Sequence, residues 1–197
     1  EGPTLVWGRG MGVIARRLEG EGDVHALFED ARDRAAKGDT HASFGLVPPK
    51  QAFGRIIIRL PKSKEALRWR LQAAAAALQC GAQVWLAGHQ REGIKSALKL
   101  MEEYVGDTVT RHTKRRCRVL VASRDAQKRE APRLDDEARS VAYTLGDREL
   151  LGITLPGVFA HGRVDAGTSR LLAWLATRKL KGSLLDLGAG AGIIGVA

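Results

Sequence analysis

Apolar residues in the first half of the chain alternate between short continuous runs and helical spacing. Residues 55–60 are rich in isoleucine, which predicts a β-strand buried on both faces, as in a parallel sheet. Apolar residues then recur at helical spacing over 67–78. A second strand at 83–88 and a second amphipathic helix at 94–105 follow. This order of strand, helix, strand and helix predicts an α/β fold with a parallel sheet covered by helices.

Shorter elements are expected on both sides of this pattern. Ser63 is a suitable N-cap for the first helix, and Gly81 is its expected C-cap. Residues 131–140 are polar and of mixed charge, which favours a linker. The other predicted elements are strands at 4–7, 23–28 and 119–122, a short polar helix at 31–37, a hairpin formed by 141–145 and 150–155, and a helix that carries Leu171, Leu172 and Leu175 and has Asp165 or Thr168 as its N-cap.

The composition is that of a soluble globular protein, since 44% of the 197 residues are hydrophobic and 27% are charged. No apolar run approaches membrane-spanning length, so no membrane partner is predicted. Cys80 and Cys117 form no C-x-x-C pair and the five histidines are scattered, so neither a disulfide framework nor a metal site is expected. We expect a monomer in a reducing cytoplasm.

Basic residues exceed acidic ones, with 32 Lys and Arg against 22 Asp and Glu and a net charge of +10. Such an excess favours a polyanionic partner, with a merely solvated basic surface as the alternative. The densest basic run is 111–118, which as a hairpin at a sheet edge would present cations to RNA phosphates or would only protect the edge from aggregation. The candidate RNA-binding residues are Arg111, Lys114, Arg115, Arg116 and Arg118.

The apolar run 184–187 is of strand type and leads through Asp186 into a glycine-rich loop. Glycines occupy alternate positions of this loop, at Gly188, Gly190 and Gly192. Lacking a Cβ, they allow positive φ and let a nucleotide-like cofactor lie against bare N–H groups near a helix N-terminus. Residues 190–195 also fit the G-x-G-x-x-G dinucleotide fingerprint. We prefer the D-x-G-x-G-x-G pattern because it uses the acidic residue, and a glycine turn that binds nothing is the third possibility.

Three linked blocks of the second half resemble a known family. The D-x-G-x-G-x-G pattern is similar to the first motif of S-adenosylmethionine-dependent methyltransferases. Before it stand L-P-G-V-F at 155–159 and D-A-G-T at 165–168. The order and spacing of these blocks resemble the small-subunit ribosomal RNA guanine-N2 methyltransferases of the RsmC type. The likeness extends more loosely to the first half, where 82–106 is similar to part of the N-terminal domain of that family.

The resemblance implies a degenerate Rossmann-like methyltransferase-type domain with an RNA-binding role at 1–135, and the start of a second Rossmann-like methyltransferase domain at 136–197. It implies methyl transfer from S-adenosylmethionine to the N2 of a guanine, with ribosomal RNA or the 30S subunit as partner. The cofactor-site residues that it implies are Phe159, Asp165, Gly167, Thr168, Asp186, Gly188, Gly190 and Gly192.

The chain departs from the family pattern in the first half. Val6 stands in the first glycine loop where Asp186 stands in the second, and 60–62 lack the asparagine and aromatic residue of the Asn-Pro-Pro-Phe catalytic motif of that family. The first domain is therefore expected to be inert in methyl transfer. The catalytic motif of the second is expected beyond Ala197, so we expect a fragment that by itself binds the cofactor weakly or not at all. The alternatives are a non-catalytic RNA-binding module and a nicotinamide-dependent oxidoreductase that uses 190–195.

Overall fold

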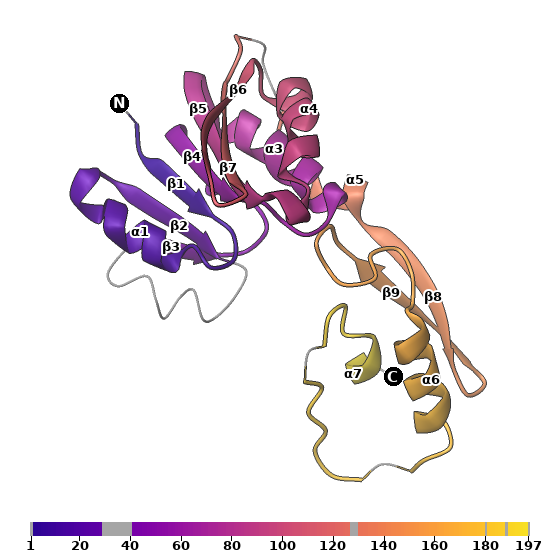
Figure 1. Cartoon of the computed structure of the whole chain (residues 1–197). Helices are drawn as coiled ribbons and strands as arrows, with labels where there is room; N and C mark the ends of the chain where they lie inside the picture. Colours follow the sequence, from indigo (N-terminus) through magenta and orange to yellow (C-terminus); the bar gives the residue numbers. More distant parts are fainter. Residues whose placement is uncertain (1, 29–40, 127–129, 180, 188, 197) are drawn as a thin grey trace. The chain divides into compact units, whose positions relative to one another are not determined.

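The computed structural model describes residues 2–28, 41–126, 130–179, 181–187 and 189–196 (Figure 1). The chain divides into two compact units, Glu1–Pro132 (unit 1) and Arg133–Ala197 (unit 2), and each is described by itself. The helix expected at 31–37 lies outside the described residues.

Unit 1 is built on a seven-stranded sheet with the strand order β3-β2-β1-β4-β5-β7-β6. Its strands are β1 (Thr4–Trp7), β2 (Val24–Phe28), β3 (His41–Phe44), β4 (Phe53–Arg59), β5 (Leu78–His89), β6 (Thr108–Lys114) and β7 (Cys117–Ser123). Strands β1 to β5 pair with one another in parallel, whereas β7 is antiparallel to both β5 and β6. The α/β class and the parallel β4–β5 pair that the hydrophobic pattern predicts are confirmed.

Among the described residues of unit 1, three α-helices pack on this sheet, and short 3-10 turns follow α1 and β5 (Figure 1). The helices are α1 (Gly12–Leu18), α3 (Lys64–Ala77) and α4 (Ile94–Tyr104), and the 3-10 turns are η1 (Glu19–Glu21) and η2 (Gln90–Glu92). The N-cap prediction is confirmed, because the Ser63 side chain accepts a hydrogen bond from the Ala66 N–H at 3.1 Å.

The predicted C-cap at Gly81 is wrong. Helix α3 ends at Ala77, and Leu78 already has an extended backbone and pairs with Phe53 in the sheet. Because the Leu78 side chain is buried in the core, tertiary packing ends the helix before the glycine is reached. Gly81 instead lies inside β5 with φ of 76°.

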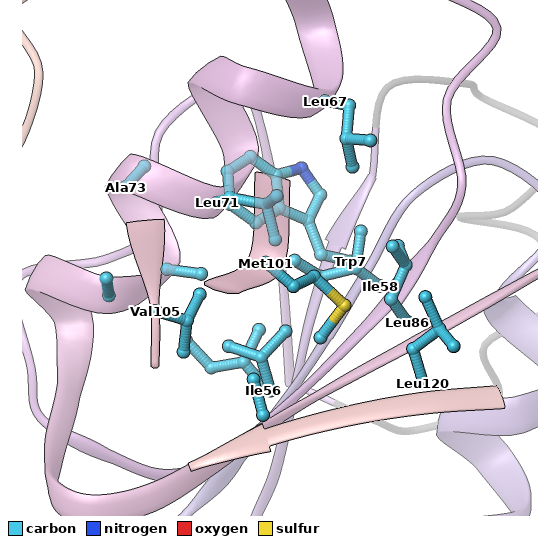
Figure 2. Close-up of a cluster of buried hydrophobic side chains, with 14 of the residues drawn as sticks. Trp7, Ile56, Ile58, Leu67, Leu71, Ala73, Leu86, Met101, Val105 and Leu120 are labelled. Atoms are coloured by element: carbon cyan, nitrogen blue, oxygen red, sulfur yellow. The ribbon is translucent and has the colours of Figure 1, made fainter. Parts of the chain in front are cut away.

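Two apolar clusters cover the opposite faces of the unit 1 sheet. In β1, Leu5 and Trp7 belong to the larger cluster, with residues of α3 and α4, whereas Val6 belongs to the smaller one beside α1. Figure 2 shows the larger cluster, in which Leu71 and Met101 meet side chains of the strands. The central strands are therefore buried on both faces, as expected of a parallel sheet.

The described part of unit 2 contains a β-hairpin and three helices, and its core is small. The elements are α5 (Leu134–Glu137), β8 (Arg139–Leu145), β9 (Arg148–Thr154), α6 (Ala166–Leu175) and α7 (Ile193–Val196). The hairpin around Gly146 and Asp147 is confirmed, and Tyr143, Leu172 and Ile193 pack together beneath it. The linker expected at 131–140 is partly ordered, because α5 and the start of β8 occupy it.

The strand expected at 184–187 is absent, although those residues are described. Leu185 and Leu187 are 80% and 87% exposed. A strand needs a ladder partner, and within the described part of unit 2 the strands β8 and β9 pair with each other. Apolar sequence alone therefore does not place this run in a sheet. Among the described residues, no helix is both long enough and apolar enough to cross a lipid bilayer.

Candidate functional site

A hollow of about 160 Å³ in unit 2 brings together residues of all three blocks of the sequence pattern. It lies between the segment before α6 and the loop before α7. Its lining residues are Phe159, Ala160, Arg163, Asp165, Thr168, Ala189, Gly190, Ala191, Ile193 and Ile194. Four of the predicted cofactor residues, Phe159, Asp165, Thr168 and Gly190, thus face one space.

Asp165 is the N-cap of α6, which settles the choice between Asp165 and Thr168. Its carboxylate accepts hydrogen bonds from the Gly167 N–H at 2.9 Å and from the Thr168 N–H and hydroxyl. The hydroxyl of Thr168, followed by these N–H groups, holds the pKa of Asp165 below its ordinary value. Gly167 therefore supports the pocket wall by holding Asp165, and it does not line the hollow.

Replacement of Asp165 by alanine is expected to lower the thermal stability of unit 2 at neutral pH and not in strong acid. The folded-state pKa lies below the unfolded value of about 3.9, so the stabilisation is full above that value and is lost as the pH falls through the folded pKa. Thermal unfolding followed by circular dichroism from neutral pH to about pH 2 measures the difference. Asp147→Ala, in the exposed β8–β9 turn, is the control, and an equal pH dependence in both variants would contradict the assignment.

The glycine loop has the backbone geometry that its sequence predicts. Gly190 and Gly192 have φ of 58° and 73°, and a Cβ built on Gly192 would meet no atom within 4 Å. The Gly192 N–H donates to the Ala189 carbonyl at 2.8 Å, so it closes a turn. The Asp186 carboxylate accepts from the Gly195 N–H at 3.1 Å and fixes the start of α7. Gly188 lies outside the described residues.

Two residues of the hollow, Ala160 and Arg163, could not be anticipated from the motif. Both lie in the spacer between the L-P-G-V-F and D-A-G-T blocks, which the pattern leaves unspecified. Ala160 has a left-handed backbone with φ of 57°, and its carbonyl accepts the Arg163 N–H at 3.0 Å. This turn places the exposed Arg163 among the residues that line the hollow. This turn is hard to predict from the sequence, because alanine rarely adopts a left-handed backbone.

The basic run forms the expected hairpin at the sheet edge, with β6 outermost. Its cations do not share one face. Lys114 pairs with Cys117 and the preceding pair joins Thr113 to Arg118, so Lys114 and Arg118 point to opposite faces of the sheet. Arg111 lies at a register shift in β6. Arg115 and Arg116 form the turn, and both are exposed.

Unit 1 has its own glycine loop after β1, and a buried arginine lies directly beneath it. The Arg70 guanidinium donates to the Arg59 carbonyl at 3.2 Å and lies 5.7 Å from the centre of the Trp7 ring. A Cβ on Gly8 would approach the Arg70 Nη1 to 3.3 Å. Arg70 could not be predicted as a buried residue from the sequence. An arginine in a helix is normally exposed to solvent, whereas this one is 6% exposed.

Family models match most of the chain. The family described as "Methyltransferase small domain N-terminal" matches residues 4–137, and the family described as "Methyltransferase small domain" matches residues 149–197. Within the described residues, no group of three or more histidine, cysteine, aspartate or glutamate side chains is arranged to hold a metal ion.

Several curated relatives carry the same name. The ribosomal RNA small subunit methyltransferase C of Stutzerimonas stutzeri is 39% identical over 87% of this chain and 50% of its own length. That of Pseudomonas putida is 36% identical over 99% of this chain and 58% of its own length. The chain thus spans about half the length of the curated relatives that it matches.

Solved structures share the fold. The T. thermophilus 16S rRNA N2 methyltransferase RsmC, in complex with AdoMet and guanosine, superimposes with a TM-score of 0.77 at 25% identity, over 89% of this chain and 48% of its own. A putative methyltransferase from Pseudomonas syringae matches with a TM-score of 0.54 at 15% identity, over 62% of this chain and 87% of its own. The expected Rossmann-like methyltransferase fold class is confirmed.

Proposed function

We propose that this chain, which belongs to the methyltransferase small domain N-terminal family, is part of an S-adenosylmethionine-dependent enzyme that methylates the N2 of a guanine in small-subunit ribosomal RNA. The observation that carries the proposal is the hollow of unit 2, where residues 159–168 and the glycine loop meet. The names of the curated relatives and the AdoMet-bound structural relative support it.

The residues of the hollow fit part of such a cofactor. Its volume of about 160 Å³ lies below the range of about 300–1,000 Å³ that is usual for small-molecule sites. Gly190 offers bare backbone for close approach, and Phe159, which is 74% exposed, offers an aromatic surface at the rim. Described residues of this chain thus form a partial pocket, consistent with the expectation that the chain alone binds the cofactor weakly.

The reaction requires an electrophilic methyl group and a weak nucleophile held in line. Bound S-adenosylmethionine would supply a methyl group on a sulfonium, and its transfer to the guanine amine would release a proton and leave a thioether. Orientation and exclusion of water are the contributions of the pocket walls. In this chain, Asp165 fixes the position of α6 and Asp186 fixes the glycine loop, so both act as positioning residues. No residue of this chain is proposed to be catalytic.

The partner that we propose is ribosomal RNA within the small subunit, bound largely by unit 1. The net charge of +10 and the five cations of the β6–β7 hairpin support a polyanionic partner. We further propose that the protein works as a monomer. We propose the cytoplasm as its location because Cys80 and Cys117 are both exposed free thiols, as suits a reducing compartment.

Calorimetric titration of the protein encoded by the complete gene tests the cofactor assignment. S-adenosylmethionine and S-adenosylhomocysteine are expected to bind, and NAD is expected not to bind. Tighter binding of NAD would instead support the dinucleotide interpretation of 190–195. Binding of none of the three, together with retained RNA binding, would support a non-catalytic RNA-binding module.

A further inference from the structure

The carboxyl ends of the parallel strands of unit 1 form one continuous edge with the β6–β7 turn. The Leu60 N–H, directly after β4, donates to the Ala87 carbonyl of β5 at 2.8 Å. The Gln90 N–H, directly after β5, donates to the Arg116 carbonyl at 2.9 Å. With β1 paired to β4, four neighbouring strands thus contribute their ends to this edge, which we call the carboxyl edge.

Cations gather along the carboxyl edge from separate segments of the sequence. The exposed ones are Arg9 after β1, Lys62 after β4, Arg91 after β5, and Arg115 and Arg116 in the turn. Two acidic residues follow these strands within a few positions: Glu92, whose carboxylate is engaged by Arg59 at 2.9 Å, and Glu65 in the first turn of α3. The strand ends therefore carry a net positive charge that no single stretch of sequence reveals.

The β6–β7 turn holds two arginines in a left-handed backbone conformation that glycine and asparagine adopt more easily. Arg115 and Arg116 have φ of 48° and 65°. A two-residue hairpin turn with positive φ at both positions is the type I′ turn, for which Asn-Gly is strongly preferred. A left-handed backbone is unfavourable for an arginine because of its Cβ. Backbone strain of this kind is found mainly at functional sites, where the side chains have a role in binding or catalysis.

We propose that the carboxyl edge of unit 1 binds the phosphodiester backbone of RNA without reading its bases. The inference rests on the proposed function, because it identifies where unit 1 holds its RNA partner. Arginine provides a planar fork of donors that matches phosphate oxygens. Among the residues of these four strand ends, all of which are described, Trp7 is the one Phe, Tyr or Trp, and it is fully buried, so no exposed indole, phenol or phenyl ring offers a base-stacking surface there.

The edge is also where Rossmann-like folds take their ligands. In unit 1 the space beneath its glycine loop is filled by the Arg70 guanidinium and the Trp7 ring. At this edge of unit 1, a row of phosphate-binding cations therefore takes the place of a cofactor site. Lys114 and Arg118 point to opposite faces of the sheet, so they contribute less to RNA binding than the row of cations along the carboxyl edge.

Two double variants of the chain separate the edge from general charge. Arg115→Asn with Arg116→Gly is expected to weaken binding of a fluorescein-labelled RNA hairpin about tenfold and to lower the slope of log affinity against log salt by about 2. The same variant is expected to raise the unfolding temperature by about 3 °C, because the turn relaxes. Lys62→Gln with Arg91→Gln, on other strands of the edge, is expected to weaken binding similarly.

The control is Arg16→Gln with Arg17→Gln, which removes the same charge from the last turn of α1, where both residues are exposed. It is expected to change the affinity less than threefold, and RNA hairpins of different sequence are expected to bind the wild-type chain equally. Equal losses in the control and edge variants, or equal binding by the edge variants and the wild-type chain, would overturn the edge assignment alone. A wild-type chain that binds no RNA at low salt would overturn the proposed RNA partner as well.

Discussion

Replacement of Gly190 by valine is expected to weaken S-adenosylmethionine binding by the protein of the complete gene about a hundredfold, or roughly 2.7 kcal/mol. Gly190 lines the hollow of unit 2 and has φ of 58°. A β-branched residue is strongly disfavoured at positive φ, so the loop would leave the geometry that presents its bare backbone to the cofactor. Isothermal titration calorimetry of the folded variant measures the loss.

Gly182→Val is the matched control for this substitution. Gly182 also has positive φ, at 87°, and lies in an exposed segment of unit 2 outside the lining of the hollow. The control therefore carries a comparable backbone strain without touching the pocket, and its cofactor affinity is expected to stay within about twofold of the wild type. Equal losses in both variants would mean that strain in unit 2, and not the pocket, controls binding.

Replacement of Trp7 by alanine is expected to destabilise unit 1 by about 3–5 kcal/mol. The Trp7 side chain is completely buried in the cluster that joins the sheet to α3 and α4, and the Arg70 guanidinium lies over its ring. Its removal leaves a large cavity and deprives a buried cation of its aromatic partner. Urea denaturation followed by far-ultraviolet circular dichroism measures the change in the free energy of unfolding.

Two further tryptophan variants show whether burial is the cause. Trp174→Ala, at a position 51% exposed, is expected to cost less than about 1 kcal/mol. Trp7→Phe keeps a ring and removes an indole N–H that has no hydrogen-bond partner among the described residues, so a cost below about 1.5 kcal/mol is expected. A loss in Trp174→Ala as large as that in Trp7→Ala would contradict the account of the core.

Local patterns were sufficient wherever neighbours in sequence decide the structure. The isoleucines of β4, the Ser63 cap and the β8–β9 turn each carry their own signal, and each prediction is confirmed. The end of α3 did not follow its glycine, because the burial of Leu78 in the sheet outweighs the preference of a helix for a glycine cap. The run 184–187 reads as a strand, but hydrogen-bonding partners decide strands, and sequence hydrophobicity does not supply them.

The candidate sites could also be predicted only where a local sequence motif specifies them. The motif blocks predict four residues that line one hollow in the structure: Phe159, Asp165, Thr168 and Gly190. Arg163 was missed because it stands in a spacer whose turn is visible only in three dimensions. The hairpin cations were named as one group, whereas their strand register separates Lys114 from Arg118. The carboxyl edge could not be predicted at all, since its cations come from four places in the chain and only the sheet order joins them.

We propose that this chain is part of an enzyme that methylates the N2 of a guanine in small-subunit ribosomal RNA. The most direct test is mass spectrometry of the nucleosides of 16S ribosomal RNA after unmethylated small subunits are incubated with the protein of the complete gene and isotopically labelled S-adenosylmethionine. We expect labelled N2-methylguanosine and no other labelled nucleoside. An absence of label, or label on a different base or atom, would contradict it.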